Sequence, residues 1–466
     1  MVRRTVEERL ALGKRARDAV PRSTHLAWEP ATDRPDPVEL LKEQDASREP
    51  DLVPERHSRM MFSPFSFYRG AARIMAVDLS GSPRTGLNVQ MCGDAHLSNF
   101  GVFASPERTL LFDLNDFDET LHGPFEFDLK RLAASFCVAG RTNGVSDAAN
   151  RTVATTVAAR YRQAMLEFAG MGPLEVWYSH LPAQQVLDLI ARSAKGKGQQ
   201  KTLRRGKAIV QKASTRNSLR ALSTLGEMVD GRYRIVSQPP LVVPLRDIES
   251  SYGLEPLGVE RVLRRLFREY RATLDPERRF LVNHFQLVDV ARKVVGVGSV
   301  GTRCFIALFE GRDRDDPLFL QVKEATSSVF EDRLSKSPYR NHGERVVRGQ
   351  RMMQAASDIF LGWMKDAEGD RHYYWRQLHD SKGSIRVDGM SAYDLHEYAK
   401  VCAWTLARAH ARSGDPIAIS AYLGHGDTFD CAIGEYACRY ADQNERDYEA
   451  FVQAVRSGSL RVLDSV

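Results

Sequence analysis

A short acidic run near the start of the chain has the side chains that a metal site needs. Within residues 113–119 four of the seven positions are acidic: Asp113, Asp116, Asp118 and Glu119. Carboxylate oxygens suit the hard cation Mg²⁺. An acidic surface turn is the alternative, but Leu114 and Phe117 alternate with the acids and favour partial burial. We therefore expect a magnesium site with Asp116 or Asp113 as its main ligand.

Lys323 is the second residue whose type and place suggest chemistry. It follows residues 318–322, all apolar except Gln321, which are typical of a buried strand. A buried ammonium group is costly unless an anion meets it, and a phosphate would do so. A lysine in water on an edge strand is the alternative. A carboxylate on the next helix should position this lysine: Glu344, which opens that helix, is preferred and Glu331 is the second choice.

A glycine-rich run lies between two predicted strands before this lysine. It follows G-x-G-x-x-G, with glycines at Gly296, Gly298 and Gly301 and a hydroxyl at Ser299. In a dinucleotide-binding fold such a run opens a helix, whereas residues 302–308 are typical of a strand. A glycine loop between antiparallel strands covers the ATP phosphates in protein kinases. A glycine-rich hairpin turn that binds nothing is the alternative.

Asp94 and Asn99 have the spacing of a kinase catalytic loop, D-x-x-x-x-N. In that loop the Asp accepts a proton from the substrate hydroxyl and the Asn holds a magnesium ion. We therefore expect Asp94, Asn99 and Lys323 to be the catalytic residues.

Longer strings around these residues resemble known families. Residues 93–99 resemble the catalytic loop of aminoglycoside and choline phosphotransferases, relatives of protein kinases, although Cys92 stands where that motif begins with His. Residues 116–118 resemble their metal-binding segment, which favours Asp116 over Asp113, and residues 123–129 resemble a helix start whose Asp, here Asp128, is structural. The chain is also similar to the bacterial family called domain of unknown function 2252, through strings at 20–23, 63–70, 115–120 and 345–354.

The order of these motifs differs from that of ordinary kinases, because Asp94 precedes the glycine run instead of following it. The resemblance therefore implies an α+β, protein-kinase-like, two-lobed fold that is circularly permuted. We expect an extended N-terminal arm over 1–55, the first part of a helix-rich large lobe over 56–281, a small β-rich lobe over 282–378 and the rest of the large lobe over 379–466. Gln377 and His379, where the small lobe ends and a hinge begins, are expected to contact the nucleotide together with the glycine run, Lys323 and Glu344.

Hydrophobic periodicity predicts the elements that carry these motifs. Helices are expected over 6–19, 64–79, 128–139, 255–275, 343–356, 391–412 and 429–455, and helices should dominate 145–230. Strands are expected over 88–92, 101–104, 109–114, 286–295, 302–309, 318–322, 359–364 and 372–378.

Composition bounds the class of protein. The 466 residues are 43% hydrophobic and 27% charged, and 66 basic residues against 60 acidic ones give a net charge of only +6. This mild excess does not favour nucleic acid, and the ten Lys and Arg residues between 192 and 220 lack interleaved aromatic side chains. No membrane span or secretory signal is expected. Six cysteines without a C-x-x-C pair favour a reducing cytoplasm over a disulfide framework or structural zinc.

These patterns predict an enzyme that uses ATP and Mg²⁺ to phosphorylate a small molecule or a protein, whose identity no motif names. A nucleotide-binding pseudokinase or scaffold and an AMP-transferase are the alternatives. A metallophosphoesterase is a weaker one, because its Gly-Asn-His element is missing: Asn341 and His342 follow Arg340.

Overall fold

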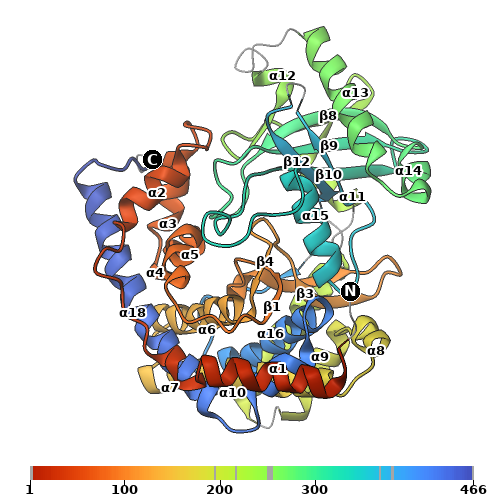
Figure 1. Ribbon diagram of the computed structural model, residues 1–466. Helices are drawn as coiled ribbons and strands as arrows, with labels where there is room; N and C mark the ends of the chain where they lie inside the picture. The colour runs from red at the N-terminus through yellow and green to blue at the C-terminus, as the bar shows by residue number, and fades with distance from the viewer. Residues whose placement is uncertain are drawn as a thin grey trace.

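The computed structural model describes residues 4–193, 196–215, 218–248, 256–366, 369–378 and 383–463. It is a mixed α+β structure, as predicted. An antiparallel sheet with its covering helices lies at one end of the molecule, and a group of long helices lies at the other (Figure 1). Among the described residues no helix combines the length and the apolar character that a membrane crossing would need.

Residues 4–80 form a series of helices joined by turns rather than an extended arm. The elements are α1 (Val6–Ala19), the 3₁₀ helix η1 (Arg22–Leu26), α2 (Pro37–Asp45), α3 (Val53–Met60), α4 (Pro64–Gly70) and α5 (Ala72–Ser80). Thr5 caps α1 in a capping box with Glu8. Arg9 then pairs with Asp415 at 2.9 Å, and Leu41 of α2 is fully buried. The prediction of an extended arm is therefore wrong beyond α1, because this segment packs on the C-terminal helices.

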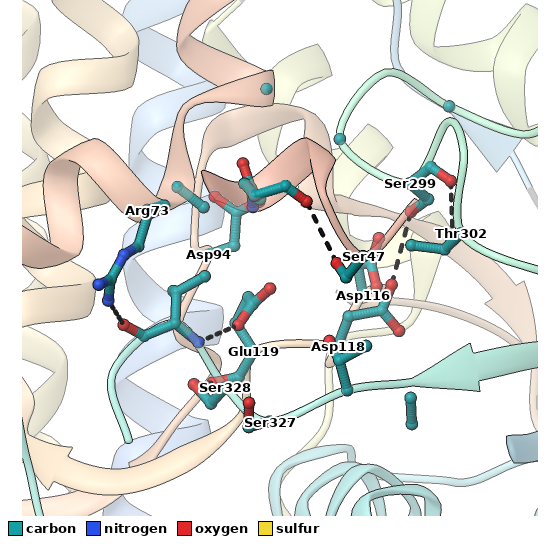
Figure 2. A pocket seen from close by; sticks show the side chains of 18 of the residues that line it. Ser47, Arg73, Asp94, Asp116, Asp118, Glu119, Ser299, Thr302, Ser327 and Ser328 are labelled. Carbon is teal, nitrogen blue, oxygen red and sulfur yellow. Dashed lines mark hydrogen bonds between the residues drawn. The ribbon is translucent and has the colours of Figure 1, made fainter. Parts of the chain in front are cut away.

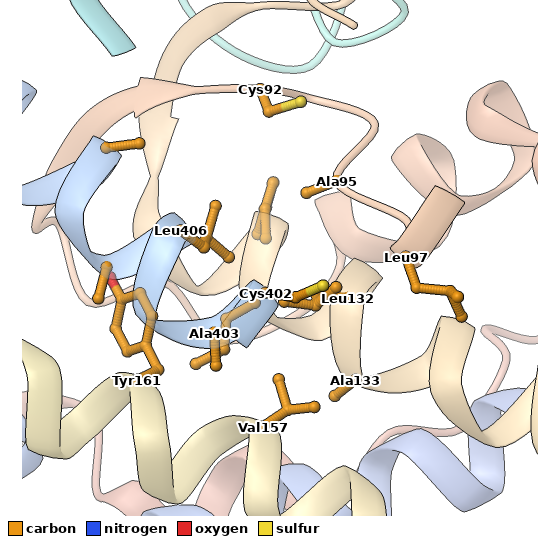
Figure 3. Packing of buried hydrophobic residues seen from close by; sticks show 14 of the residues in the cluster. Cys92, Ala95, Leu97, Leu132, Ala133, Val157, Tyr161, Cys402, Ala403 and Leu406 are labelled. Carbon is orange, nitrogen blue, oxygen red and sulfur yellow. The ribbon is translucent and has the colours of Figure 1, made fainter. Parts of the chain in front are cut away.

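The helical part is built around α6, whose residues from Phe125 to Gly140 are all buried. Helices α7, α16 and α18 contact it. In the core, Leu132 and Ala133 of α6 lie close to Val157 of α7 and to Ala403 and Leu406 of α16 (Figure 3). The helices of this part are α6 (Phe125–Thr142), α7 (Asp147–Ala169), α8 (Pro173–Tyr178), α9 (Ala183–Ser193), α10 (Lys197–Ser214), α16 (Ala392–Ser413), α17 (Pro416–Leu423) and α18 (Thr428–Arg456).

Two small sheets hold the N-terminal motifs on this helical part. Strand β1 (Asn88–Met91) pairs with β4 (Leu121–Pro124), and β2 (Phe100–Ala104) pairs with β3 (Leu110–Leu114) and with β13 (Gly383–Ser384). The loop 92–96 and the 3₁₀ helix η2 (Leu97–Asn99) connect β1 to β2. Residues 115–120 connect β3 to β4, so both motif-bearing loops leave the ends of short paired strands.

A larger sheet has six antiparallel strands in the order β11-β12-β10-β9-β8-β7. Its strands are β7 (Val242–Pro244), β8 (Gln286–Lys293), β9 (Cys304–Glu310), β10 (Pro317–Ala325), β11 (Gly362–Lys365) and β12 (His372–Gln377). Tyr270 of α13 packs on one face with Phe309 and Trp375, while Leu222 of α11 packs on the other face with Phe319.

This sheet unit starts before the predicted boundary at residue 282. It includes α11 (Ser218–Leu225), the hairpin β5 (Gly226–Val229) and β6 (Arg232–Ile235), α12 (Leu245–Ile248), α13 (Pro256–Ala272) and α14 (Pro276–Val282). Helix α15 (His342–Met353) contacts β10, β11 and β12 on one side and α16 of the helical part on the other.

Most of the helices and strands that hydrophobic periodicity predicted are found at the predicted positions. Helices α1, α6, α13, α15, α16 and α18 are present, as are strands β1, β2, β3, β8, β9, β10, β11 and β12. The helix predicted over 64–79 is divided at Ala71, whose backbone leaves the helical region at ψ 33°. Helices α2 and α17 were missed, because each is short and starts directly after a proline-rich or glycine-rich turn.

Candidate functional site

A cavity of about 590 Å³ lies where the two halves of the chain meet. Its walls come from the N-terminal helices α2, α4 and α5, from the loops 92–99 and 115–120, and from the glycine-rich run and the segment 324–332. Figure 2 shows Asp116 and Asp118 beside Ser299, whose hydroxyl lies 3.5 Å from Asp118 Oδ2, and Asp94 and Glu119 farther along the cavity. The structure thus brings the predicted catalytic loop, acidic run and glycine-rich run together.

The loop that carries Asp94 is held by Asp128. The carboxylate of Asp128 accepts hydrogen bonds from the backbone N–H groups of Cys92 (2.6 Å) and Gly93 (2.9 Å), and from His410 Nε2 (3.2 Å). Gly93 has φ +82°, and a Cβ there would lie 2.2 Å from the carbonyl oxygen of Glu119. The loop therefore needs glycine at this position, and Asp128 has the structural role that its motif implies.

One oxygen of Asp94 is engaged and the other is nearly free. Oδ1 accepts hydrogen bonds from the guanidinium of Arg131, at 2.8 Å from Nε. Oδ2 has His96 Nε2 at 3.8 Å. Burial lowers the pKa of His96 well below its ordinary value, with Arg69 and Arg131 adding to the shift. His96 is therefore neutral, and its Nδ1 accepts the N–H of Ser98 at 3.2 Å, so its proton lies on Nε2, toward Asp94.

Asn99 is oriented by the same loop. Its side-chain Nδ2 donates to the backbone carbonyl of Asp94 at 2.6 Å, which leaves Oδ1 as an acceptor. Asn99 and Asp116 both line the cavity.

Asp116 presents an unsatisfied carboxylate oxygen. Its Oδ1 is buried without a hydrogen-bond partner, and the nearest cation is Lys323 Nζ at 3.9 Å. Burial and the neighbouring Asp118 raise the pKa of Asp116. A buried carboxylate oxygen without a donor is an unfavourable state that a cation would relieve.

The predicted pairing of Lys323 with Glu344 is wrong. Lys323 is 2% exposed and donates to Asp118 Oδ2, with Ser299 Oγ at 3.3 Å. Glu344 instead has Arg348 Nε at 3.4 Å. Burial alone would lower the pKa of Lys323, but Asp116 and Asp118 raise it well above its ordinary value. The partner of the lysine is thus an acid of the loop rather than of the helix.

Glu331, the second choice, does not pair with Lys323 either. Its carboxylate lies 3.6 Å from Arg345 Nε and 3.8 Å from His342 Nδ1. The α15 side chain that reaches the acidic loop is Arg345, whose guanidinium donates to the backbone carbonyls of Asp118 (2.8 Å) and Thr120 (2.6 Å). A cation on α15 therefore fixes the backbone of the loop where a carboxylate had been expected.

Asp118 lines the cavity, but the sequence prediction did not include it among the site residues. Besides Lys323, it accepts a hydrogen bond from the Tyr374 hydroxyl at 2.7 Å. Burial opposes its ionisation, but the charge and hydrogen bond of Lys323 outweigh that effect and lower its pKa. The acidic run contained a signal for Asp118, but nothing local in the sequence indicated that it would meet a lysine 205 positions away.

Asp113, the alternative metal ligand, is placed elsewhere by the structure. It is 1% exposed and forms an ion pair with Arg408 of α16, while its Oδ2 accepts the N–H of Ala355 at 2.9 Å. It is not among the residues that line the cavity. The expectation that Asp113 binds a metal is therefore wrong, and Asp116 is the acid with a free oxygen.

The glycine-rich run forms the turn between β8 and β9 and is fastened to the N-terminal segment. Gly301 O accepts the N–H of Glu49 at 2.7 Å, and Gly296 O accepts from Arg59 Nη1 at 2.6 Å. The Arg48 guanidinium donates to the carbonyl of Val300, which directly precedes Gly301. Gly296 and Gly301 have φ +73° and +87°. These are left-handed conformations that favour glycine.

The two predicted nucleotide contacts at the hinge have different outcomes. Gln377 is the last residue of β12, opposite Leu320 in the register, and its N–H donates to the Asp358 carboxylate. It does not line the cavity. His379 lies outside the described residues.

A magnesium ion at this site would need oxygen ligands from the cavity wall. Among the described residues, no three His, Cys, Asp or Glu side chains form a group that could hold a metal unaided. Mg²⁺ usually takes one or two carboxylates and completes its octahedron with phosphate oxygens and water. The free oxygens of Asp116 and Asn99, with Asp118 beside them, fit that pattern.

Comparison with known families agrees with the sequence strings. Residues 48–454 match a family described as "Uncharacterized protein conserved in bacteria (DUF2252)". The chain belongs to the DUF2252 family. The DUF2252 match spans both halves of the cavity, and the preceding residues add Gln44 and Ser47 to its wall. No curated protein and no solved structure matches the chain.

Proposed function

We propose that this protein is an ATP- and Mg²⁺-dependent phosphotransferase whose site is a circularly permuted version of the protein-kinase arrangement. The observation that carries the proposal is the convergence on one cavity of the Asp94–Asn99 loop, the Asp116–Asp118 loop and the glycine-rich turn, with Lys323 directly behind. These groups come from distant parts of the sequence, and the motifs that carry them resemble those of kinases.

Asp94 is proposed as the base that accepts the proton of the acceptor hydroxyl. Arg131 binds Oδ1 and fixes the carboxylate, so Oδ2 is the oxygen available to the hydroxyl. A base must lie within hydrogen-bond reach of the proton that it takes, and Asp94 lines the cavity.

Asp116, Asp118 and Asn99 are proposed to hold the magnesium ion. When bound, the ion would neutralise the charge of the phosphate groups and so favour transfer. The unsatisfied Oδ1 of Asp116 and the Oδ1 that Asn99 leaves free support this assignment.

Lys323 is proposed as the phosphate anchor. In the structure its charge is met by Asp118, which is the state expected of a buried lysine that has no other anion. A bound triphosphate would take the place of Asp118 as the anion that faces the ammonium group, with Ser299 of the glycine turn beside it.

Two measurements on the wild type test the proposal. Isothermal titration calorimetry should give binding of ATP that needs Mg²⁺. Incubation with cell metabolites and ATP labelled on the α or the γ phosphate should then transfer the γ label. Transfer of the α label would instead identify an AMP-transferase, and binding without either transfer or hydrolysis would identify a pseudokinase. Absence of any Mg·ATP binding would refute the nucleotide assignment.

The Asp94→Asn variant separates catalysis from binding. It should keep the wild-type affinity for Mg·ATP and lower the rate of transfer, or of slow ATP hydrolysis, by about 10²-fold. Glu344→Gln is the matched control, because it removes a carboxylate that the structure places with Arg348. Hydrolysis by Asp94→Asn at the wild-type rate would exclude Asp94 as the base.

A further inference from the structure

The charged side chains around the cavity are mostly neutralised by partners in its wall. Ion pairs join Lys323 to Asp118, Arg131 to Asp94, Arg73 to Asp332 (2.8 Å) and Arg303 to Glu324 (3.3 Å). Glu119 accepts the N–H of Val329 at 2.7 Å. Groups that are already paired have little to offer a ligand, so the unpaired ones indicate what the cavity binds.

In the described wall of the cavity, two charged side chains have a buried polar atom without a hydrogen-bond partner. Neither side chain forms any hydrogen bond with another described residue. One is the Asp116 carboxylate, through Oδ1, and the other is the Arg69 guanidinium, through Nε. No described residue makes a hydrogen bond or ion pair with the Arg69 guanidinium. Arg48 also has an unpartnered Nε, but its guanidinium donates to the Val300 carbonyl and lies 3.6 Å from Asp45.

Arg69 lies beside the glycine-rich turn and lines the cavity together with the loops that carry Asp94 and Asp116. It is the penultimate residue of α4, and a Cβ on Gly298 would lie 3.0 Å from its backbone oxygen, so the glycine turn packs on this point of the helix. The side chain lines the cavity together with Asp94 and Asp116. Burial lowers the pKa of Arg69, and the charges of Asp94, Asp388 and Asp116 partly oppose that shift.

We infer that Arg69 binds the terminal phosphoryl group of the nucleotide as it faces Asp94. This inference rests on the proposed function and adds to it the residue that meets the charge of the group being transferred. A carboxylate oxygen and a guanidinium that both lack a hydrogen bond, on one cavity, are complementary to a metal ion and a phosphate bound together. The planar guanidinium can donate two parallel hydrogen bonds to phosphate oxygens.

The transfer itself balances without another reactant. The acceptor hydroxyl gives its proton to Asp94 while its oxygen forms a bond to the γ-phosphorus. The bond from that phosphorus to the bridging oxygen breaks, and its electron pair leaves with ADP. Arg69 changes no bond, and it stabilises the charge on the phosphoryl oxygens throughout.

The test compares the affinities of Arg69→Gln and Arg69→Lys for Mg·ATP and Mg·ADP with those of the wild type. Loss of a charge-assisted hydrogen bond corresponds to about 10- to 100-fold in affinity. Arg69→Gln should therefore lower the affinity for Mg·ATP by that factor and change the affinity for Mg·ADP by less than about twofold. Arg69→Lys keeps the positive charge and so disturbs the fold less. It should lower the affinity for Mg·ATP by an intermediate factor.

Arg73→Gln is the matched control. Arg73 also lines the cavity, and Arg73→Gln also removes a guanidinium. This guanidinium is already paired with Asp332 and with the Val329 carbonyl, at 3.0 Å from the latter. Its ratio of ATP to ADP affinity should equal that of the wild type. An unchanged ratio in both Arg69 variants would overturn the inference.

Inorganic pyrophosphate with Mg²⁺ distinguishes failure of this inference from failure of the proposed function. If the wild type binds pyrophosphate but no ATP, and Arg69→Gln abolishes that binding, then the anion site stands and the nucleotide assignment fails. If the wild type binds Mg·ATP and the Arg69 variants keep the ratio, only the role of Arg69 is refuted. Binding of neither probe refutes both.

Discussion

Two adjacent acids of the cavity have opposite electrostatic states. Asp118 has Lys323 and the Tyr374 hydroxyl as partners, and its pKa is lowered. Glu119, the next residue, is met mainly by one backbone N–H, and burial raises its pKa to about 7. Residue type alone could not separate them, because the difference comes from which partner each side chain meets.

Glu119 should make the stability of the fold depend on pH. A carboxyl group whose pKa is raised in the folded state binds its proton more tightly there. Its contribution is therefore fully present below its ordinary pKa of 4.5 and is lost as the pH rises to about 7. Above that range, ionised Glu119 lies near Asp118 and Asp94, and the charges of Arg345, Arg48 and Arg73 only partly offset the cost of its burial.

Glu119→Gln measures this contribution, because glutamine resembles the protonated acid. Between pH 5 and 8 the free energy of unfolding of the wild type, measured in urea, should fall relative to that of Glu119→Gln. Glu344→Gln, at a half-buried position of α15 beside Arg348, should run parallel to the wild type. A constant difference between wild type and Glu119→Gln over this range would contradict a raised pKa.

At the scale of elements, the β8–β9 turn is the point where the sheet unit meets the N-terminal segment. Val300 at its tip is fully buried and packs with Leu52 and Val294. Together with the hydrogen bonds that the Glu49 N–H and the Arg59 guanidinium donate to its backbone carbonyls, this packing fixes a loop that a glycine-rich sequence would otherwise leave free to move.

Two glycines of this turn allow the packing to be measured. Gly296→Ala places a side chain at φ +73° with no atom within 4 Å, so it should cost only the backbone strain, about 1 kcal/mol. Gly301→Ala has the same strain at φ +87°, and its Cβ would also lie 3.0 Å from Arg48 Cβ. It should cost a further 1–3 kcal/mol or so, the range for overpacking.

Denaturant unfolding of the two glycine variants gives the comparison. Hydrogen exchange over residues 44–52 should increase in Gly301→Ala and stay unchanged in Gly296→Ala, since only the former displaces Arg48. Equal losses of stability in the two variants would show that Arg48 does not hold the turn.

The elements themselves were largely predictable, and their contacts were not. Long apolar periods identified β8, β9, β10, α15 and α16 to within a few residues, because burial of one face requires such a period. The catalytic loop and the acidic run were predicted to lie near the glycine turn, and they line one cavity. The partner of Lys323 was missed, because pairing between Lys323 and Asp118 depends on tertiary packing and leaves no local pattern.

At the scale of the whole molecule, the large sheet cannot be separated from the preceding helices at residue 282, the boundary predicted from its strands. Tyr270 of α13 stacks on Trp375 with ring centroids 4.5 Å apart, and Leu222 and Leu225 of α11 cover the opposite face. Both helices precede residue 282, so a fragment that starts there would expose apolar side chains on both faces of the sheet.

A fragment of residues 282–378 should therefore aggregate or remain unfolded, whereas a fragment of residues 218–378 should be monomeric. Circular dichroism and size-exclusion chromatography of the two fragments make the comparison. Trp375→Ala in the longer fragment is a control that removes part of the same packing, and it should lower the midpoint of thermal unfolding. Cooperative unfolding of the shorter fragment would show that the helices are dispensable.

The burial of α6 has a consequence for detecting ligands. Because its residues from Phe125 to Gly140 are enclosed by α7, α16 and α18, its amide protons can exchange with solvent only when the whole bundle opens. A ligand at a hundred times its Kd, bound anywhere on the folded protein, should slow that exchange by roughly a hundredfold. Amides of the β8–β9 turn open locally and should slow only when the ligand occupies the cavity. Deuterium uptake by these two segments in one sample would thus report both whether a compound binds and where.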